Sequence, residues 1–123
     1  MKLQELPEIL AVCRLEPQSE IPAWAIKSRF FSITKTSDEL SIVCEQSIVP
    51  TSVKAEIDWK CFRVVGTLDF SLTGILAAIA SPLAQEKISI FAISTFDTDY
   101  VLIKSATWAR GLRVLQEAGF NFE

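Results

Sequence analysis

The clearest pattern along this chain is an apolar strand, a polar turn that carries carboxylates, and a second apolar strand, and it occurs twice. Residues 91–103 align without a gap on residues 31–43. In this alignment Phe91 falls on Phe31 and Asp99 falls on Glu39. A hairpin used twice predicts two similar halves packed together. It also predicts two acidic turns that a small ligand can approach.

The remaining pattern supplies the elements around the two hairpins. Apolar residues at helical spacing, from Leu72 to Leu83, predict a helix capped by Asp69 or Ser71. Pro82 interrupts that helix, so we expect a kink near Ala78 or a break at Ser81. The other predicted elements are strands at 9–15, 29–36, 40–44, 59–67, 88–96, 100–104 and 120–122, one helical turn at 22–26, and a helix that Ser105 caps, that runs through Ala118 and that stops at Gly119.

The order of these elements predicts an α+β fold. Both halves read βαββαβ, the order of a ferredoxin-like unit with helices on one face of an antiparallel sheet. The first half has a shortened first helix, because too few residues separate its first strand from its hairpin. We therefore expect two units in tandem, at 1–57 and 58–123.

The strand at 88–96 carries a further clue. Ile88, Ile90, Ala92 and Phe96 lie on one face, and Phe91 and Ile93 lie on the other. A strand that is apolar on both faces is usually covered on both. Because one helix layer covers only one face, we expect the other half of the chain or a second copy of the protein to cover the other.

Composition narrows the function classes. The net charge of −3 argues against nucleic acid or anionic membranes as partners. No apolar run reaches the roughly 20 residues of a membrane helix, and the N-terminus does not read as a secretory signal. The chain has no histidine, which excludes an ordinary Ser-His or Cys-His catalytic pair and leaves few ligands for a metal. We predict no enzyme activity, no metal and no cofactor.

Three separated cysteines, Cys13, Cys44 and Cys61, form no Cys-x-x-Cys pair. All three lie in predicted strands, so buried free thiols are the favoured interpretation, with a reactive thiol as the alternative. Free thiols are typical of a reducing compartment, and we expect a cytoplasmic protein.

Several blocks, in order, resemble a known family. Gly66-Thr-Leu-Asp-Phe-Ser-Leu-Thr-Gly74-Ile75, Ser81-Pro-Leu83, Ile88-Ser-Ile-Phe91 and Ser94-Thr-Phe-Asp-Thr-Asp-Tyr100 resemble the ACT domains of small bacterial tandem-ACT proteins and of the animal cytosolic arginine sensors. The strong part covers about Trp59 to Lys104. Upstream segments resemble the N-terminal half of the bacterial proteins, so the resemblance extends over nearly the whole chain.

This resemblance implies binding of an amino acid or a similar small effector between paired domains, with no catalysis. Because the chain has two such domains where the animal sensors have four, a homodimer would have to supply the partner half. Carried over, the resemblance implies a site formed by the loop into the first helix, the strand at 88–96 and the acidic turn. Its predicted residues are Gly66, Asp69, Phe70, Ser71, Thr73, Gly74, Ser89, Ile90, Thr95, Phe96, Thr98 and Asp99.

Each of these residues also has a plainer interpretation. Gly66 and Gly74 can serve a turn and tight packing as well as ligand contact. Asp99 can hold an ammonium group or be an exposed turn carboxylate, and Phe96 can be a packing residue. At the level of the whole protein, the alternative is an interaction or structural protein that keeps this fold, forms homo-oligomers and binds no ligand.

Overall fold

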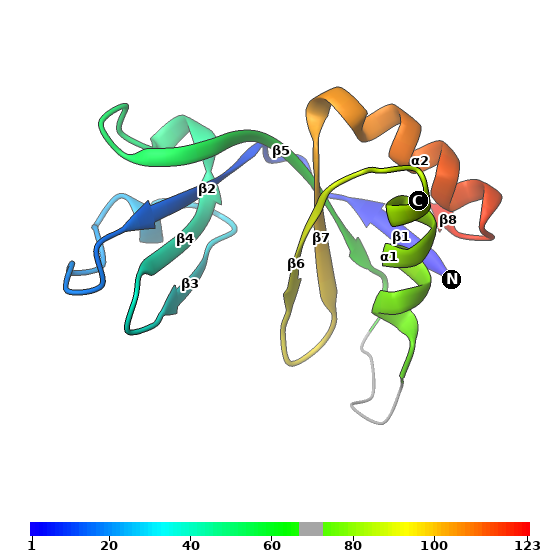
Figure 1. Ribbon diagram of the computed structural model, residues 1–123, viewed down its shortest axis with the longest axis horizontal. Coiled ribbons are helices and arrows are strands. Elements are labelled where there is room, and N and C mark those ends of the chain that lie inside the picture. The colour runs from blue at the N-terminus through cyan, green and yellow to red at the C-terminus, as the bar shows by residue number, and fades with distance from the viewer. Residues whose placement is uncertain (67–72) are drawn as a thin grey trace. The chain divides into compact units, whose positions relative to one another are not determined.

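The structure is a computed structural model that describes residues 1–66 and 73–123. The chain forms two compact units: residues 8–59 form the N-terminal unit, and residues 1–7 join residues 60–123 in the C-terminal unit (Figure 1). The elements are β1 (Lys2–Glu5), β2 (Leu10–Leu15), the 3-10 helix η1 (Ala25–Lys27), β3 (Ser32–Lys35), β4 (Leu40–Glu45), the 3-10 helix η2 (Gln46–Ile48), β5 (Lys54–Val64), α1 (Ile75–Gln85), β6 (Ile90–Ser94), β7 (Asp99–Lys104), the 3-10 helix η3 (Ser105–Thr107), α2 (Trp108–Glu117) and β8 (Asn121–Phe122). Both units are ferredoxin-like, as the sequence predicts.

The N-terminal unit has the strand order β3-β4-β2-β5, and these neighbours run antiparallel. Its β5 segment pairs from Lys54 to Trp59 with β2. Alternate residues of β2 and β4 point to one core, which η1 covers through the fully buried Ala25. The predicted shortening of the first helix is confirmed, since η1 has three residues where α1 has eleven.

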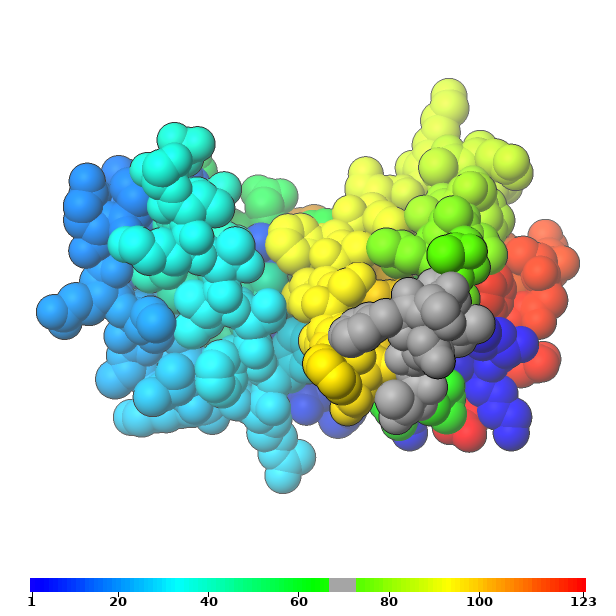
Figure 2. All heavy atoms as spheres, turned by 90° about the horizontal axis from the view of Figure 1, so that it is seen from below, coloured from blue at the N-terminus to red at the C-terminus, as the bar shows by residue number. Residues whose placement is uncertain are grey.

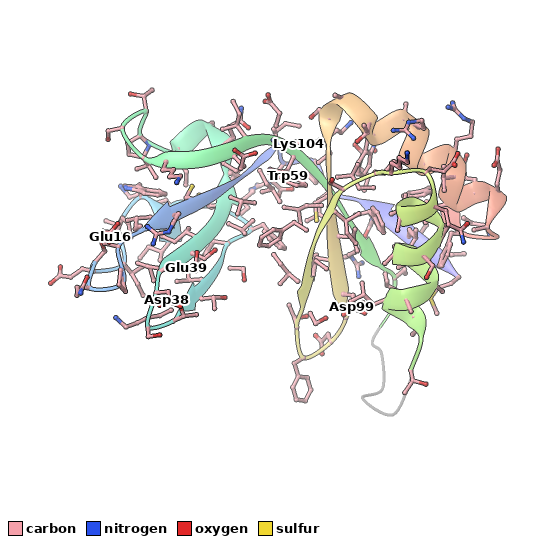
Figure 3. The ribbon with its side chains drawn as sticks, viewed as in Figure 1. Glu16, Asp38, Glu39, Trp59, Asp99 and Lys104 are labelled. Atoms are coloured by element: carbon pink, nitrogen blue, oxygen red, sulfur yellow. The ribbon has the colours of Figure 1, made fainter. Side chains whose placement is uncertain are left out.

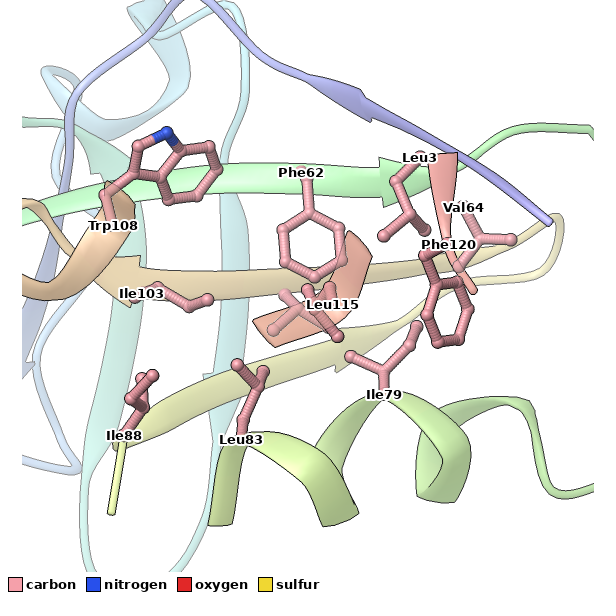
Figure 4. Packing of buried hydrophobic residues seen from close by; sticks show 11 residues of the cluster. Leu3, Phe62, Val64, Ile79, Leu83, Ile88, Ile103, Trp108, Leu115 and Phe120 are labelled. Atoms are coloured by element: carbon pink, nitrogen blue, oxygen red, sulfur yellow. The ribbon is translucent and has the colours of Figure 1, made fainter. Parts of the chain in front are cut away.

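The C-terminal unit has the strand order β6-β7-β5-β1-β8, and both α-helices lie on one face of this sheet (Figure 1). Ile79 and Leu83 of α1 and Leu115 of α2 are completely buried against the sheet, beside Phe62 and Ile103 (Figure 4). Burying such apolar side chains is the main stabilising term of this unit.

The first strand, β1, was not predicted, and its residues were expected in the N-terminal unit. Instead β1 pairs antiparallel with the end of β5, Leu3 opposite Val64, and parallel with β8. Leu3 is completely buried in the core of the C-terminal unit. A strand of four residues gives too short an alternation to be recognised in the sequence.

Helix α1 runs without a break from Ile75 to Gln85 although Pro82 lies inside it, so the predicted break at Ser81 is wrong. Ile79 precedes Pro82 and Leu83 follows it, and both are completely buried in the core of the C-terminal unit. Packing on both sides of the proline therefore outweighs the backbone hydrogen bond that it removes.

The predicted helix caps are not observed. Asp69 and Ser71 lie outside the described residues, and the residue before α1 is Gly74, with no side-chain cap. Ser105 begins η3, and α2 starts only at Trp108. Gly119 follows α2 with a φ of 101°, the conformation of a helix-ending glycine, as predicted.

The repeated hairpin is present, but its two copies correspond one residue away from the alignment made on the sequence. Lys35 pairs with Leu40 in one hairpin and Ser94 pairs with Asp99 in the other. Each turn is closed by an amide that donates to a carbonyl three residues on, from Thr36 to Glu39 and from Thr95 to Thr98, both at 2.9 Å. Thr98, and not Asp99, therefore occupies the position of Glu39.

Strand β6 is shorter and less buried than its sequence predicts. It pairs only with β7 among the described strands, so it lies at the edge of its unit. Ala92 and Ser94 are exposed, and none of its five residues is fully buried. The C-terminal unit by itself therefore leaves part of β6 uncovered.

Candidate functional site

The helix-entry loop is described only at its two ends. Asp69, Phe70 and Ser71 lie outside the described residues. Gly66 has a φ of 97° and Gly74 a φ of 81°, a backbone conformation that other residues rarely adopt. A Cβ atom on either glycine would meet nothing within 4 Å. The backbone conformation of the loop, and not tight packing, therefore explains both glycines.

The turn at Thr95–Thr98 uses its threonine hydroxyls to stabilise the fold. Thr95 Oγ1 donates to the carbonyl of Thr98 at 3.0 Å and accepts from the amide of Thr98 at 3.3 Å. Thr98 Oγ1 donates to the carbonyl of Val64 at 2.8 Å, and Thr98 is only 4% exposed. These bonds hold the turn against the end of β5, where the helix-entry loop begins.

Asp99 lies at the turn end of β7 (Figure 3). Its Oδ1 accepts a hydrogen bond of 2.6 Å from Ser94 Oγ, directly across the hairpin. Asp38 and Glu39 lie at the turn of the other hairpin. In the observed register Glu39 corresponds to Thr98, so the two hairpins do not repeat the charge of Asp99 at the same position. Phe96, at the tip of the turn, is 78% exposed and is not a core packing residue.

Ser89 and Ile90 lie at the opposite end of the hairpin from this turn. Ile90 pairs with Ile103, and Ser94 is the last residue of β6. At about 3.4 Å per residue, Ile90 and Ser94 are separated by about 14 Å along the strand. One small ligand cannot contact both ends of β6 within a single chain.

A pocket of about 310 Å³ opens in the C-terminal unit between the start of α1 and the end of α2. It is lined by Met1, by Thr73, Gly74, Ile75 and Ala78 at the start of α1, and by Ala118, Gly119 and Phe120 after α2. The hydrogen bond from Asn121 N to the Met1 carbonyl, at 3.0 Å, holds the start of the chain beside its end (Figure 2).

Two residues of this pocket, Thr73 and Gly74, belong to the predicted site, and the other six were missed. Ile75 was assigned to the buried face of the helix and Gly119 to its end. No sequence pattern indicated that Met1 lies at a pocket, because the strand that follows it was not recognised. Of the predicted site residues, the pocket thus contains only those just before α1. The predicted hairpin residues do not line it.

The three cysteines are buried free thiols, as predicted. Cys13 pairs with Ile42 and Cys44 with Ala11, so the two thiols are diagonal neighbours on one face of the sheet. A hydrogen bond with Cys44 lowers the pKa of Cys13, although burial raises it. The same bond, together with burial, raises the pKa of Cys44 far above its ordinary range.

Residues 1–66 and 73–123 contain no group of three or more acidic, cysteine or histidine side chains that could hold a metal ion. Neither α-helix in these ranges is long and apolar enough to cross a membrane.

Solved structures show where else this fold occurs. The crystal structure of protein Atu0741 from Agobacterium tumefaciens is 39% identical, with a TM-score of 0.94 over 99% of this chain and 91% of that one. The aspartokinase alpha and beta subunits are 18% identical, with a TM-score of 0.65 over 96% of this chain and 97% of that one. At such low identity the second likeness shows the fold alone.

Curated relatives match about two thirds of this chain. The human cytosolic arginine sensor for mTORC1 subunit 1 is 33% identical over 96 residues, which cover 71% of this chain and 29% of that protein. The human protein CASTOR3P is 31% identical over 90 residues, 63% of this chain and 55% of that protein. The chain thus spans only about a quarter to a half of the length of these relatives.

Sequence models of families match both parts of the chain. One for an N-terminal domain matches residues 8–52. The model of the ACT domain matches residues 54–117, more than half of the chain, and includes both α-helices and the pocket residues from Thr73 to Ala78. The chain therefore belongs to the ACT domain family.

Proposed function

We propose that this chain is a non-catalytic regulatory protein that binds a small molecule, an amino acid, in its C-terminal ACT unit. The observation that carries the proposal is the pocket at the start of α1, lined by Thr73 and Gly74. Unpaired amides at a helix start favour a carboxylate, and the first α1 bond from this end runs from Ala78 N to Gly74 O. The arginine sensor relative supports an amino acid as the ligand.

The chemistry of the pocket favours binding over catalysis. Its lining residues carry no acidic, basic or thiol side chain. General acid–base catalysis needs such a group within hydrogen-bond reach of the reacting atom. A cytosolic relative and three buried free thiols support a cytoplasmic location for the protein.

The proposal includes a homodimer. Strand β6 is an edge strand whose uncharged sequence, Ile-Phe-Ala-Ile-Ser, has no Lys, Pro or bulge to prevent pairing with another strand. Ser89 and Ile90 are too far from the turn at Thr95–Thr98 for one ligand to contact both within the same chain. In a homodimer, Ser89 and Ile90 of a second copy would lie beside this turn.

Sedimentation at micromolar concentration tests the dimer. We expect a dimer for the natural chain and a monomer for Ala92→Lys, which places a charge on the exposed side of β6. Thr34→Lys, on the corresponding edge strand β3, is the matched control and should leave the dimer intact. A monomeric natural chain contradicts the dimer.

A thermal-shift screen against the common amino acids tests ligand binding. A ligand at a hundredfold excess over its dissociation constant stabilises the folded protein by about 2.7 kcal/mol. Asp99 does not line the pocket, so Asp99→Ala weakens a ligand found in this way only where the ligand also contacts the acidic turn, and Glu39→Ala, at the turn of the other hairpin, is the control. Unchanged affinity in Asp99→Ala removes Asp99 from the site.

A second candidate function is an interaction protein without a ligand. The exposure of Phe96, 78% at the tip of the turn, favours it, because an exposed aromatic side chain is typical of a contact with another protein. Dimerisation of the natural chain without a thermal shift for any amino acid supports this candidate over the first.

A further inference from the structure

The chemistry of the pocket between α1 and α2 points to one class of amino acid. We infer that it accepts an amino acid with an apolar side chain, of the size of leucine, isoleucine or methionine, and disfavours arginine. This inference rests on the proposed function and names its ligand class.

The described side chains that line the pocket are uncharged. Ile75 and Ala78 form the wall from α1, Phe120 and Ala118 form the wall beyond α2, and Met1 closes a third side. The only polar side chain among these residues is the hydroxyl of Thr73. A guanidinium placed there would find no carboxylate partner among the described lining residues, whereas an apolar side chain is stabilised by leaving water.

The size of the pocket sets the second limit. A pocket of about 310 Å³ has room for one amino acid of the size of leucine. It lies at the lower end of the range for small-molecule sites, so a single amino acid suits it better than a peptide or a nucleotide.

The core of the C-terminal unit fixes the walls. Phe120 is only 8% exposed, and its amide donates to the carbonyl of Leu115 at 3.0 Å. Ile75 packs against the same core cluster. A pocket whose walls are already in place needs little ordering on binding, so the match of side-chain chemistry decides which ligand is held.

Isothermal titration calorimetry of the full chain with leucine, methionine, arginine and aspartate tests the inference. We expect leucine or methionine to bind at least tenfold more tightly than arginine. Ala78→Leu fills the pocket and should weaken that binding at least tenfold. Ala77→Leu, an equally exposed neighbour on α1 that does not line the pocket, is the matched control and should change it less than twofold.

Both variants introduce a good helix former on an exposed helix surface, so both should fold, and their melting curves verify this. Tight binding of arginine or aspartate alone overturns the inference and leaves the proposed function standing. Equal effects of the two alanine variants also overturn it, since the ligand then lies outside this pocket. Binding of none of the common amino acids overturns the proposed function itself.

Discussion

The contact between α2 and the sheet can be tested at a single glycine. Gly111 is buried in the middle of α2, and a Cβ added there would lie 3.1 Å from Cδ1 of Ile103. The next neighbours are ordinary contacts, Leu83 Cδ2 at 3.7 Å and Ile103 Cγ2 at 3.8 Å. Because Ile103 is completely buried, its side chain has little room to move away.

Two opposing terms set the effect of Gly111→Ala. Alanine favours a helix over glycine by about 1 kcal/mol. Overpacking a buried contact costs about 1–3 kcal/mol. We therefore expect Gly111→Ala to lower the free energy of unfolding by about 1 kcal/mol. Ile103→Val removes Cδ1 and alone costs about 0.5–1.5 kcal/mol.

The double variant separates the two terms. Without Cδ1, Gly111→Ala keeps only its helix-propensity gain and should stabilise the Ile103→Val protein by about 1 kcal/mol. The coupling between the two sites is then about 2 kcal/mol, within the range of residues in contact. Ala109→Gly, at an exposed position of α2, is the control; it should cost about 1 kcal/mol in both backgrounds.

Urea unfolding followed by circular dichroism measures these free energies, with equal slopes required for all variants. If the effects of Gly111→Ala and Ile103→Val add to within about 0.5 kcal/mol, the close contact does not limit the helix. Such additivity would contradict the prediction that Ile103 Cδ1 opposes a side chain at position 111.

Three further predictions concern stability. Thr98→Val removes the hydroxyl that donates to the carbonyl of Val64 and should destabilise the protein by about 1–3 kcal/mol in urea unfolding; no loss would show that this bond does not anchor the turn. Pro82→Ala restores a helical amide inside α1 and should raise the melting temperature; a lower one would show that the proline suits its place. Because Cys44 keeps its proton in the folded state, stability should fall as the pH rises above 9.0, the ordinary pKa of a thiol, and the Cys13→Ala/Cys44→Ala protein should lack that part of the fall; identical pH profiles would contradict it.

The sequence predicts the fold well where periodicity is strong. The two hairpins, α2 and the order of elements in both units follow from alternating or helical spacing. The register between the two hairpins does not follow, because Ile42 and Val43 are adjacent apolar residues, as are Leu102 and Ile103, so a shift of one residue still matches apolar to apolar. Only the closing hydrogen bonds of the turns show which shift is correct.

The site was predicted less completely than the fold, for a physical reason. A pocket is formed by residues that are far apart in the chain, and this one joins Met1 to Gly119 through the pairing of β1 with β8. Such pairing is not visible in local patterns. The glycines at 66 and 74 were visible, because a residue without a side chain marks an unusual backbone conformation.

The difference between the two units bears on where the proposed ligand would bind. In the C-terminal unit an eleven-residue helix covers the sheet, and its start forms one wall of the pocket. In the N-terminal unit the same place in the order of elements is taken by η1, with three residues, and its Ala25 is completely buried in the core. The turn of that unit is also held by its own side chains, since Arg14 Nη2 donates to the carbonyl of Asp38 at 2.9 Å. A 3-10 turn of three residues offers no comparable wall, so we assign the proposed binding role to the C-terminal unit.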